Sequence, residues 1–170
     1  MPGRAGTLGD VPARLSFLMK TILIGLGNPI LGDDGVGWKV AEEVRKQLPA
    51  EMPVTVELLG LGGISLMEHL IGYDRAILID AVISDQDTGS VIVSKLSEMP
   101  DYSAFHTTSP HDTSLQNALR LGKLMGAHLP EDVTVVGIAA NQIYDFSEEF
   151  SPAVAGAIPK ASKIVMSMLA

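Results

Sequence analysis

The sequence predicts an α/β fold, namely a three-layer α/β/α sandwich with a mostly parallel, roughly five-stranded central sheet. Short apolar runs rich in β-branched residues recur along the chain, as expected of strands that are buried on both faces. Segments with helical spacing of apolar residues lie between these runs. Strands that alternate with helices in this way favour parallel pairing within one sheet.

Five segments have the composition of buried strands, because each is short, apolar and rich in Val, Ile or Leu. In chain order they are Thr21–Leu26, Val54–Leu59, Ala76–Val82, Ser90–Val93 and Val133–Ile138. Apolar residues three to four positions apart predict helices elsewhere. The clearest repeats cover residues 36–48, 115–122 and 154–168, the last preceded by Ser151 as a cap and Pro152 as a first-turn proline.

The length of 170 residues favours a single domain. We expect residues 1–18 to be a disordered N-terminal extension, since they contain Pro, Gly and Arg but no apolar stretch long enough for a secretory signal. Residues 19–170 then form one domain, because no linker rich in Pro, Gly or Ser divides them.

Composition excludes several classes of function. The 20 acidic residues exceed the 12 basic ones, so no basic patch is available for nucleic acid, and a protein or small molecule is the expected partner. No run approaches the roughly 18 apolar residues of a membrane span. The chain has no cysteine, which excludes thiol chemistry and fits a reducing compartment, so we expect a cytoplasmic protein. We also expect a monomer, since no long apolar helix face remains once the sheet is covered.

Ligands of open α/β sheets bind beyond the carboxyl ends of the strands, so the chemistry is expected there. The densest polar signal is the segment Gly25–Gly37, which follows the first strand and leads into the first helix. It does not fit a dinucleotide fingerprint, because Ile30 stands where a glycine is needed and no acidic residue ends the second strand.

Asp33 and Asp34 in this segment allow two interpretations. A helix N-terminus is capped and stabilised by an acidic side chain, but one aspartate would suffice for that. The second is flanked by Gly35 and Gly37, which permit close approach of another chain and indicate a carboxylate kept available for a ligand. Asp80, at the end of the third strand, either satisfies turn amides or joins the same edge as a second functional carboxylate.

Two histidines, His106 and His111, lie in the polar segment that precedes residue 115. His111 is the better candidate ligand, because Pro110 fixes the backbone before it and the helix start, with Asp112 as its expected cap, fixes the backbone after it. His106 is a reserve ligand. Two carboxylates and one imidazole would form an open site that holds a divalent ion moderately and leaves room for water or substrate. The chain contains neither His-Glu-x-x-His nor Gly-x-Ser-x-Gly, which disfavours ordinary zinc proteases and serine hydrolases.

From about residue 19 to the C-terminus, the order and spacing of these motifs resemble those of the nickel–iron hydrogenase maturation endopeptidases. The motifs are Gly25–Gly37, Gly62-Gly63, Ile79-Asp80-Ala81, Ser109-Pro110-His111, and Ser151-Pro152 with Ala157-Ile158-Pro159. The resemblance implies a protease that removes a short C-terminal extension from the hydrogenase large-subunit precursor once nickel has been inserted.

By motif position, the resemblance assigns the metal contacts and the catalytic roles to Asp34, Asp80 and His111, and loop shaping or substrate binding to Asn28 and Asp33. One segment departs from the family: this chain has Ala139-Ala140-Asn141 after the last strand, where such proteins commonly have Glu-Pro or Gln-Pro. We expect nickel to be supplied by the precursor, although another divalent metal could bind in vitro. A metal carried by the protein itself and a non-catalytic nickel-binding chaperone or assembly factor are the alternatives.

Overall fold

The computed structural model describes residues 19–101, 113–141 and 146–170. Within them, five strands form one sheet in the order β2-β1-β3-β5-β4. The strands are β1 (Thr21–Leu26), β2 (Val54–Leu59), β3 (Arg75–Val82), β4 (Val91–Lys95) and β5 (Asp132–Ala139). The α-helices are α1 (Val36–Gln47), α2 (Gly63–Leu70), α3 (Leu115–Leu124) and α4 (Pro152–Leu169), and two 3-10 helices are η1 (Gly32–Gly35) and η2 (Leu96–Glu98).

The sheet is mostly parallel, as predicted. Strand β1 pairs in parallel with both β2 and β3, and β3 pairs in parallel with β5. Only the edge strand β4 runs antiparallel, against β5. The carboxyl ends of the four parallel strands therefore meet at one edge, which we call the carboxyl edge of the sheet.

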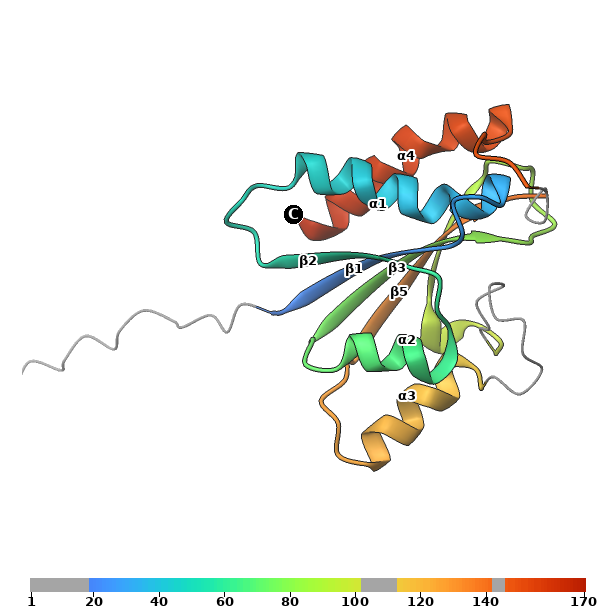
Figure 1. Ribbon diagram of the computed structural model, residues 1–170. Helices are drawn as coiled ribbons and strands as arrows, with labels where there is room; N and C mark the ends of the chain where they lie inside the picture. The colour runs from blue at the N-terminus through green and yellow to red at the C-terminus, as the bar shows by residue number, and fades with distance from the viewer. Residues whose placement is uncertain (1–18, 102–112, 142–145) are drawn as a thin grey trace, which may run out of the picture.

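Helices cover both faces of the sheet, which confirms the three-layer architecture. Helices α1 and α4 lie on one face, and α2 and α3 lie on the other (Figure 1). Successive side chains of a strand point to opposite faces: in β3, Ile77 and Ile79 pack in the core under α1 and α4, whereas Ala76 and Leu78 pack in the core under α2 and α3. Because β3 is covered on both faces, it has the nearly continuous apolar sequence from which it was predicted.

Some boundaries differ from the sequence prediction. Strand β4 ends at Lys95 rather than Val93, because its pairing with β5 continues as far as Lys95, opposite Thr134. The prediction that Asp112 caps the helix beginning near residue 115 was wrong. Ser114 occupies the N-cap of α3, where its hydroxyl accepts a hydrogen bond from the Asn117 N–H at 3.2 Å. Asp112 lies outside the described residues.

None of the helices in the described part of the chain combines the length and the apolar character needed to cross a bilayer.

Candidate functional site

The acidic loop, residues 27–35, follows β1 at the carboxyl edge. Asp34 is buried, with 3% of its surface exposed, and its Oδ2 accepts a hydrogen bond from the Asn28 N–H at 2.9 Å. The Asn28 side-chain oxygen accepts in turn from the Ile30 N–H at 3.2 Å. Neither aspartate caps a helix with its side chain, since both lie inside η1 and Gly35 precedes α1. Asn28 and Asp34 therefore hold the loop in a closed turn.

Asp33 has a different partner, from the far end of the chain. Its two carboxylate oxygens accept hydrogen bonds from the Ser151 N–H at 2.7 Å and from the Ser151 hydroxyl at 2.8 Å. Ser151 occupies the N-cap of α4, as predicted, but its side chain makes no capping bond; its hydroxyl instead donates to Asp33. Sequence reasoning missed this link, since no local signal pairs residues that are 118 positions apart.

Glycines let the start of α1 pack directly on the sheet. A Cβ at Gly37 would collide with the carbonyl oxygens of Leu26, the last residue of β1, and of Ile79 in the second half of β3. A Cβ at Gly35 would lie 2.8 Å from the Cα of Pro29. From the sequence we expected another chain to approach these two glycines, but the segments that approach them belong to this chain. The absence of side chains at these positions thus brings the acidic loop against the end of β3.

Asp80 lies at that end of β3 and is fully buried. Residue 25 of β1 pairs with residue 79, so Asp80 is level with the end of β1, where the acidic loop begins. Burying a carboxylate costs free energy unless it is paired or hydrogen-bonded. Asp34 meets this condition through the Asn28 N–H, and together with Asp80 it places buried carboxylates on two neighbouring elements of the carboxyl edge.

The predicted histidine ligand His111 lies outside the described residues, as does the reserve ligand His106. Thr113 is the first described residue after this segment. Its carbonyl oxygen packs closely against Gly63, so that a Cβ added to Gly63 would lie only 2.7 Å from it. Gly63 begins α2 at the carboxyl edge, so residue 113 also reaches this edge. Among the residues that the structure describes, no group of three or more His, Asp or Glu side chains is arranged to hold a metal ion.

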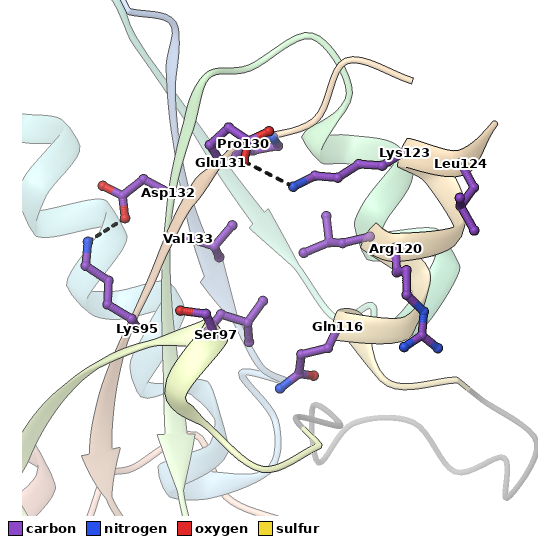
Figure 2. Close-up of a pocket in the computed structure, with 12 residues that line it drawn as sticks. Lys95, Ser97, Gln116, Arg120, Lys123, Leu124, Pro130, Glu131, Asp132 and Val133 are labelled. Atoms are coloured by element: carbon purple, nitrogen blue, oxygen red, sulfur yellow. Dashed lines mark hydrogen bonds and ion pairs between the residues drawn. The ribbon is translucent and has the colours of Figure 1, made fainter. Parts of the chain in front are cut away.

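A cavity of about 590 Å³ lies elsewhere, between β4, α3 and the start of β5 (Figure 2). Leu96, Leu119 and Val133 contribute apolar surface to it. On its rim, Lys123 pairs with Glu131 at 3.5 Å and Lys95 pairs with Asp132. Because Asp132 and Val133 begin β5, this cavity opens at the amino end of the strand, away from Asp34 and Asp80. Asp34 and Asp80 remain the candidate functional site.

Comparison with known proteins gives a consistent result. A family model described as hydrogenase maturation protease matches residues 38–168. The hydrogenase expression/formation protein HupD of Rhizobium leguminosarum bv. viciae is 28% identical over 162 residues, which are 95% of this chain and 77% of that protein. The hydrogenase 2 maturation protease of Escherichia coli is 28% identical over 125 residues, 71% of this chain and 73% of that protein.

Solved structures agree in fold. The hydrogenase maturating endopeptidase HybD from E. coli superposes with a TM-score of 0.69 at 24% identity, covering 89% of this chain and 92% of that one. A hydrogenase 2 maturation peptidase from Thaumarchaeota archaeon SCGC_AB-539-E09 gives a TM-score of 0.63 at 26% identity, covering 88% and 97%. The family model spans most of the chain, including most of α1, all of β2 to β5 and nearly all of α4, and the fold is shared. This chain belongs to the hydrogenase maturation protease family.

Proposed function

We propose that this chain is an endopeptidase that removes a C-terminal extension from the large-subunit precursor of a nickel–iron hydrogenase after nickel insertion. The observation that carries the proposal is the pair of buried aspartates, Asp34 and Asp80, at the carboxyl edge of a fold that belongs to the maturation proteases. Ordered carboxylates at this edge are placed where open α/β sheets bind their ligands. The proposed substrate is therefore a protein that reaches this edge with its C-terminal segment.

Asp34, Asp80 and His111 are the proposed contacts to the nickel of the precursor. Carboxylate and imidazole groups both bind divalent transition metals, so the two described carboxylates fit such an ion. A metal bound there would anchor the scissile segment and polarise its carbonyl group. A ligand set of two carboxylates and one imidazole leaves positions for groups of the precursor.

The chain's own residues would hold and orient these groups. The Asn28 N–H fixes one oxygen of Asp34, and the Asp33–Ser151 pair fixes the loop that carries Asp34. A carboxylate that does not contact the metal would act as general base and accept a proton from the attacking water. Of the two neighbouring aspartates in the loop, Asp33 has both oxygens bonded to Ser151, so its proposed task is to position the loop.

The competing mechanism is that the protein carries its own metal ion. It is tested by dialysing the isolated protein, measuring its retained metal and assaying it with precursor. Little retained metal and full activity are expected if nickel belongs to the precursor. Activity that rises and falls with metal retained by the protein would instead support the resident ion, including another divalent metal in vitro.

The alternative function is that of a non-catalytic chaperone or assembly factor that binds nickel. Turnover separates the two functions. We expect one molecule of the protein to process many molecules of nickel-loaded precursor, measured by intact mass at a large molar excess of precursor. Stoichiometric binding with an unchanged precursor mass would contradict the protease and favour the chaperone. The cytoplasmic location, the monomeric state and the absence of nucleic-acid and membrane partners, all expected from the sequence, stay predictions.

A further inference from the structure

Exposed large hydrophobic side chains recur at the carboxyl edge. Ile30 follows β1, Ile64 lies in the first turn of α2 after β2, Ile83 follows β3, and Phe146 follows β5. Their exposed fractions are 49%, 47%, 57% and 86%. Single exposed apolar side chains are ordinary, but a group of them around a candidate site is typical of an interaction surface.

Ile30 and Phe146 are joined through their backbones. The Ser147 N–H donates to the Ile30 carbonyl at 3.0 Å, and the Gly32 N–H donates to the Ser147 carbonyl at 2.6 Å. These two bonds form a parallel bridge between Leu31 and Ser147, whose register places Ile30 opposite Phe146. The bridge therefore brings the backbones of Ile30 and Phe146 close together.

The same two segments are joined a second time by the Asp33–Ser151 hydrogen bonds. The exposed pair is therefore built on the loop that carries Asp34, and four hydrogen bonds fix it to the segment before α4. Such a surface is ordered before a partner arrives, which reduces the entropy cost of binding.

Acidic residues lie beside the apolar pair. Glu148 and Glu149 follow directly after Ser147, and both are exposed. A partner segment that fits this surface would combine an apolar side chain with a basic one, since charge complementarity guides association and fixes register.

We propose that Ile30, Phe146, Glu148 and Glu149 form a docking surface for a segment of the precursor that carries an apolar side chain next to a basic one. This inference rests on the proposed function, because that function brings the precursor to the carboxyl edge. The docking surface binds substrate beside the two aspartates and takes no part in bond cleavage.

The test is the steady-state kinetics of cleavage of nickel-loaded precursor. For Phe146→Ser and Ile30→Ser we expect KM to rise about tenfold with kcat unchanged, as is usual for loss of an apolar contact made equally in ground and transition states. Phe146→Leu should recover most of the loss. The double variant Glu148→Gln/Glu149→Gln should raise KM and weaken its dependence on salt.

Two matched controls keep the result specific. Leu124→Ser removes a side chain that is 79% exposed at the end of α3, and Glu51→Gln removes an exposed acid in the segment between α1 and β2, so both should retain the KM of the wild type. An unchanged KM for Phe146→Ser, with cleavage by the wild type intact, would overturn the docking surface alone. A wild type that cleaves nothing would overturn the proposed function and this inference with it. A dimer that dissociates on Phe146→Ser would assign the surface to a second copy and also overturn the inference.

Discussion

Adjacent aspartates in the acidic loop have separate tasks. Asp33 uses both carboxylate oxygens to bind Ser151, whereas Asp34 accepts from the Asn28 N–H. The sequence indicated that one aspartate would suffice for capping and that the other has a further role, but it gave no partner for either. Residues 28 and 34 are close in sequence, so their contact could be anticipated from the Asn-Pro turn. The contact with Ser151 depends on how the sheet places α4, and local patterns contain no information about that.

Removing the charge of either proposed catalytic aspartate should stop cleavage. We expect Asp34→Asn and Asp80→Asn to lower kcat by at least about 100-fold, the usual contribution of a general acid or base. Asparagine has nearly the same shape, so the urea midpoint should change little. Cleavage of nickel-loaded precursor and urea unfolding are the two measurements. His111→Ala should likewise abolish cleavage, and a fully active His111→Ala protein would transfer the ligand role to His106.

The hydrogen bonds of Asp74 lead us to predict that the stability of the protein depends on pH. The Lys20 N–H and then the His128 ring, each at 2.8 Å, bond to its carboxylate and hold its pKa below the ordinary value. The folded state thus favours the ionised form more than the unfolded state does. This stabilisation is fully present above the ordinary pKa and is lost as pH falls through the lowered one.

We therefore expect Asp74→Asn to unfold at lower urea than the wild type at pH 7, and the two midpoints to converge as pH falls below the lowered pKa. Glu51→Gln, which changes an exposed acid, should match the wild type at every pH. A gap between Asp74→Asn and the wild type that is constant from pH 7 to pH 2 would contradict this account.

At the scale of elements, the buried strands were the most predictable part of the fold. The sequence of β3 is apolar at nearly every position because α1 and α4 cover one face and α2 and α3 cover the other. The end of β4 at Lys95 could not be predicted, since the apolar run stops before the pairing with β5 does. The glycines of the acidic loop correctly indicated a close approach of backbone. From the sequence we expected another chain to make this approach at Gly35 and Gly37, whereas segments of the same chain make it.

The contact between α1 and the sheet is tested by substituting Gly37. Its Cβ would collide with two carbonyl oxygens of β1 and β3, so we expect Gly37→Ala to reduce the free energy of unfolding by about 1–3 kcal/mol. The matched control is Gly156→Ala on α4, where the added Cβ meets nothing within 4 Å beyond its chain neighbours and the adjacent helix backbone. This control should gain about 0.5–1 kcal/mol from helix propensity. Equal effects of the two substitutions in urea unfolding would refute the close packing of α1.

The link between the acidic loop and α4 is tested by Ser151→Ala. Loss of the hydroxyl bond to the buried Asp33 carboxylate should cost about 1.5–3 kcal/mol and lower the cleavage rate, because the loop that carries Asp34 loses a support. Ser167→Ala removes an exposed hydroxyl that bonds to the Ile164 carbonyl and should change stability by less than about 0.5 kcal/mol. Thermal and urea unfolding report the stability, and turnover reports the function; wild-type values for Ser151→Ala in both would contradict the link.

For the whole molecule, the sheet order explains why distant motifs form one site. Because β1 lies next to β3, the acidic loop and Asp80 meet at one edge even though β2 and α2 lie between them in sequence. The alternation of strands and helices predicted this edge and both aspartates. It could not predict the proposed docking surface, since the pairing of residues 30–32 with Ser147 joins two segments that are far apart in the sequence.

The central claim is that this edge cleaves a hydrogenase precursor only after nickel has been inserted. The most direct measurement is the intact mass of the large-subunit precursor, nickel-loaded and nickel-free, after incubation with catalytic amounts of the protein. We predict loss of a short C-terminal peptide from the loaded form and an unchanged mass for the nickel-free form. Cleavage of both forms at the same rate would contradict nickel recognition, and an unchanged mass of both would contradict the protease itself.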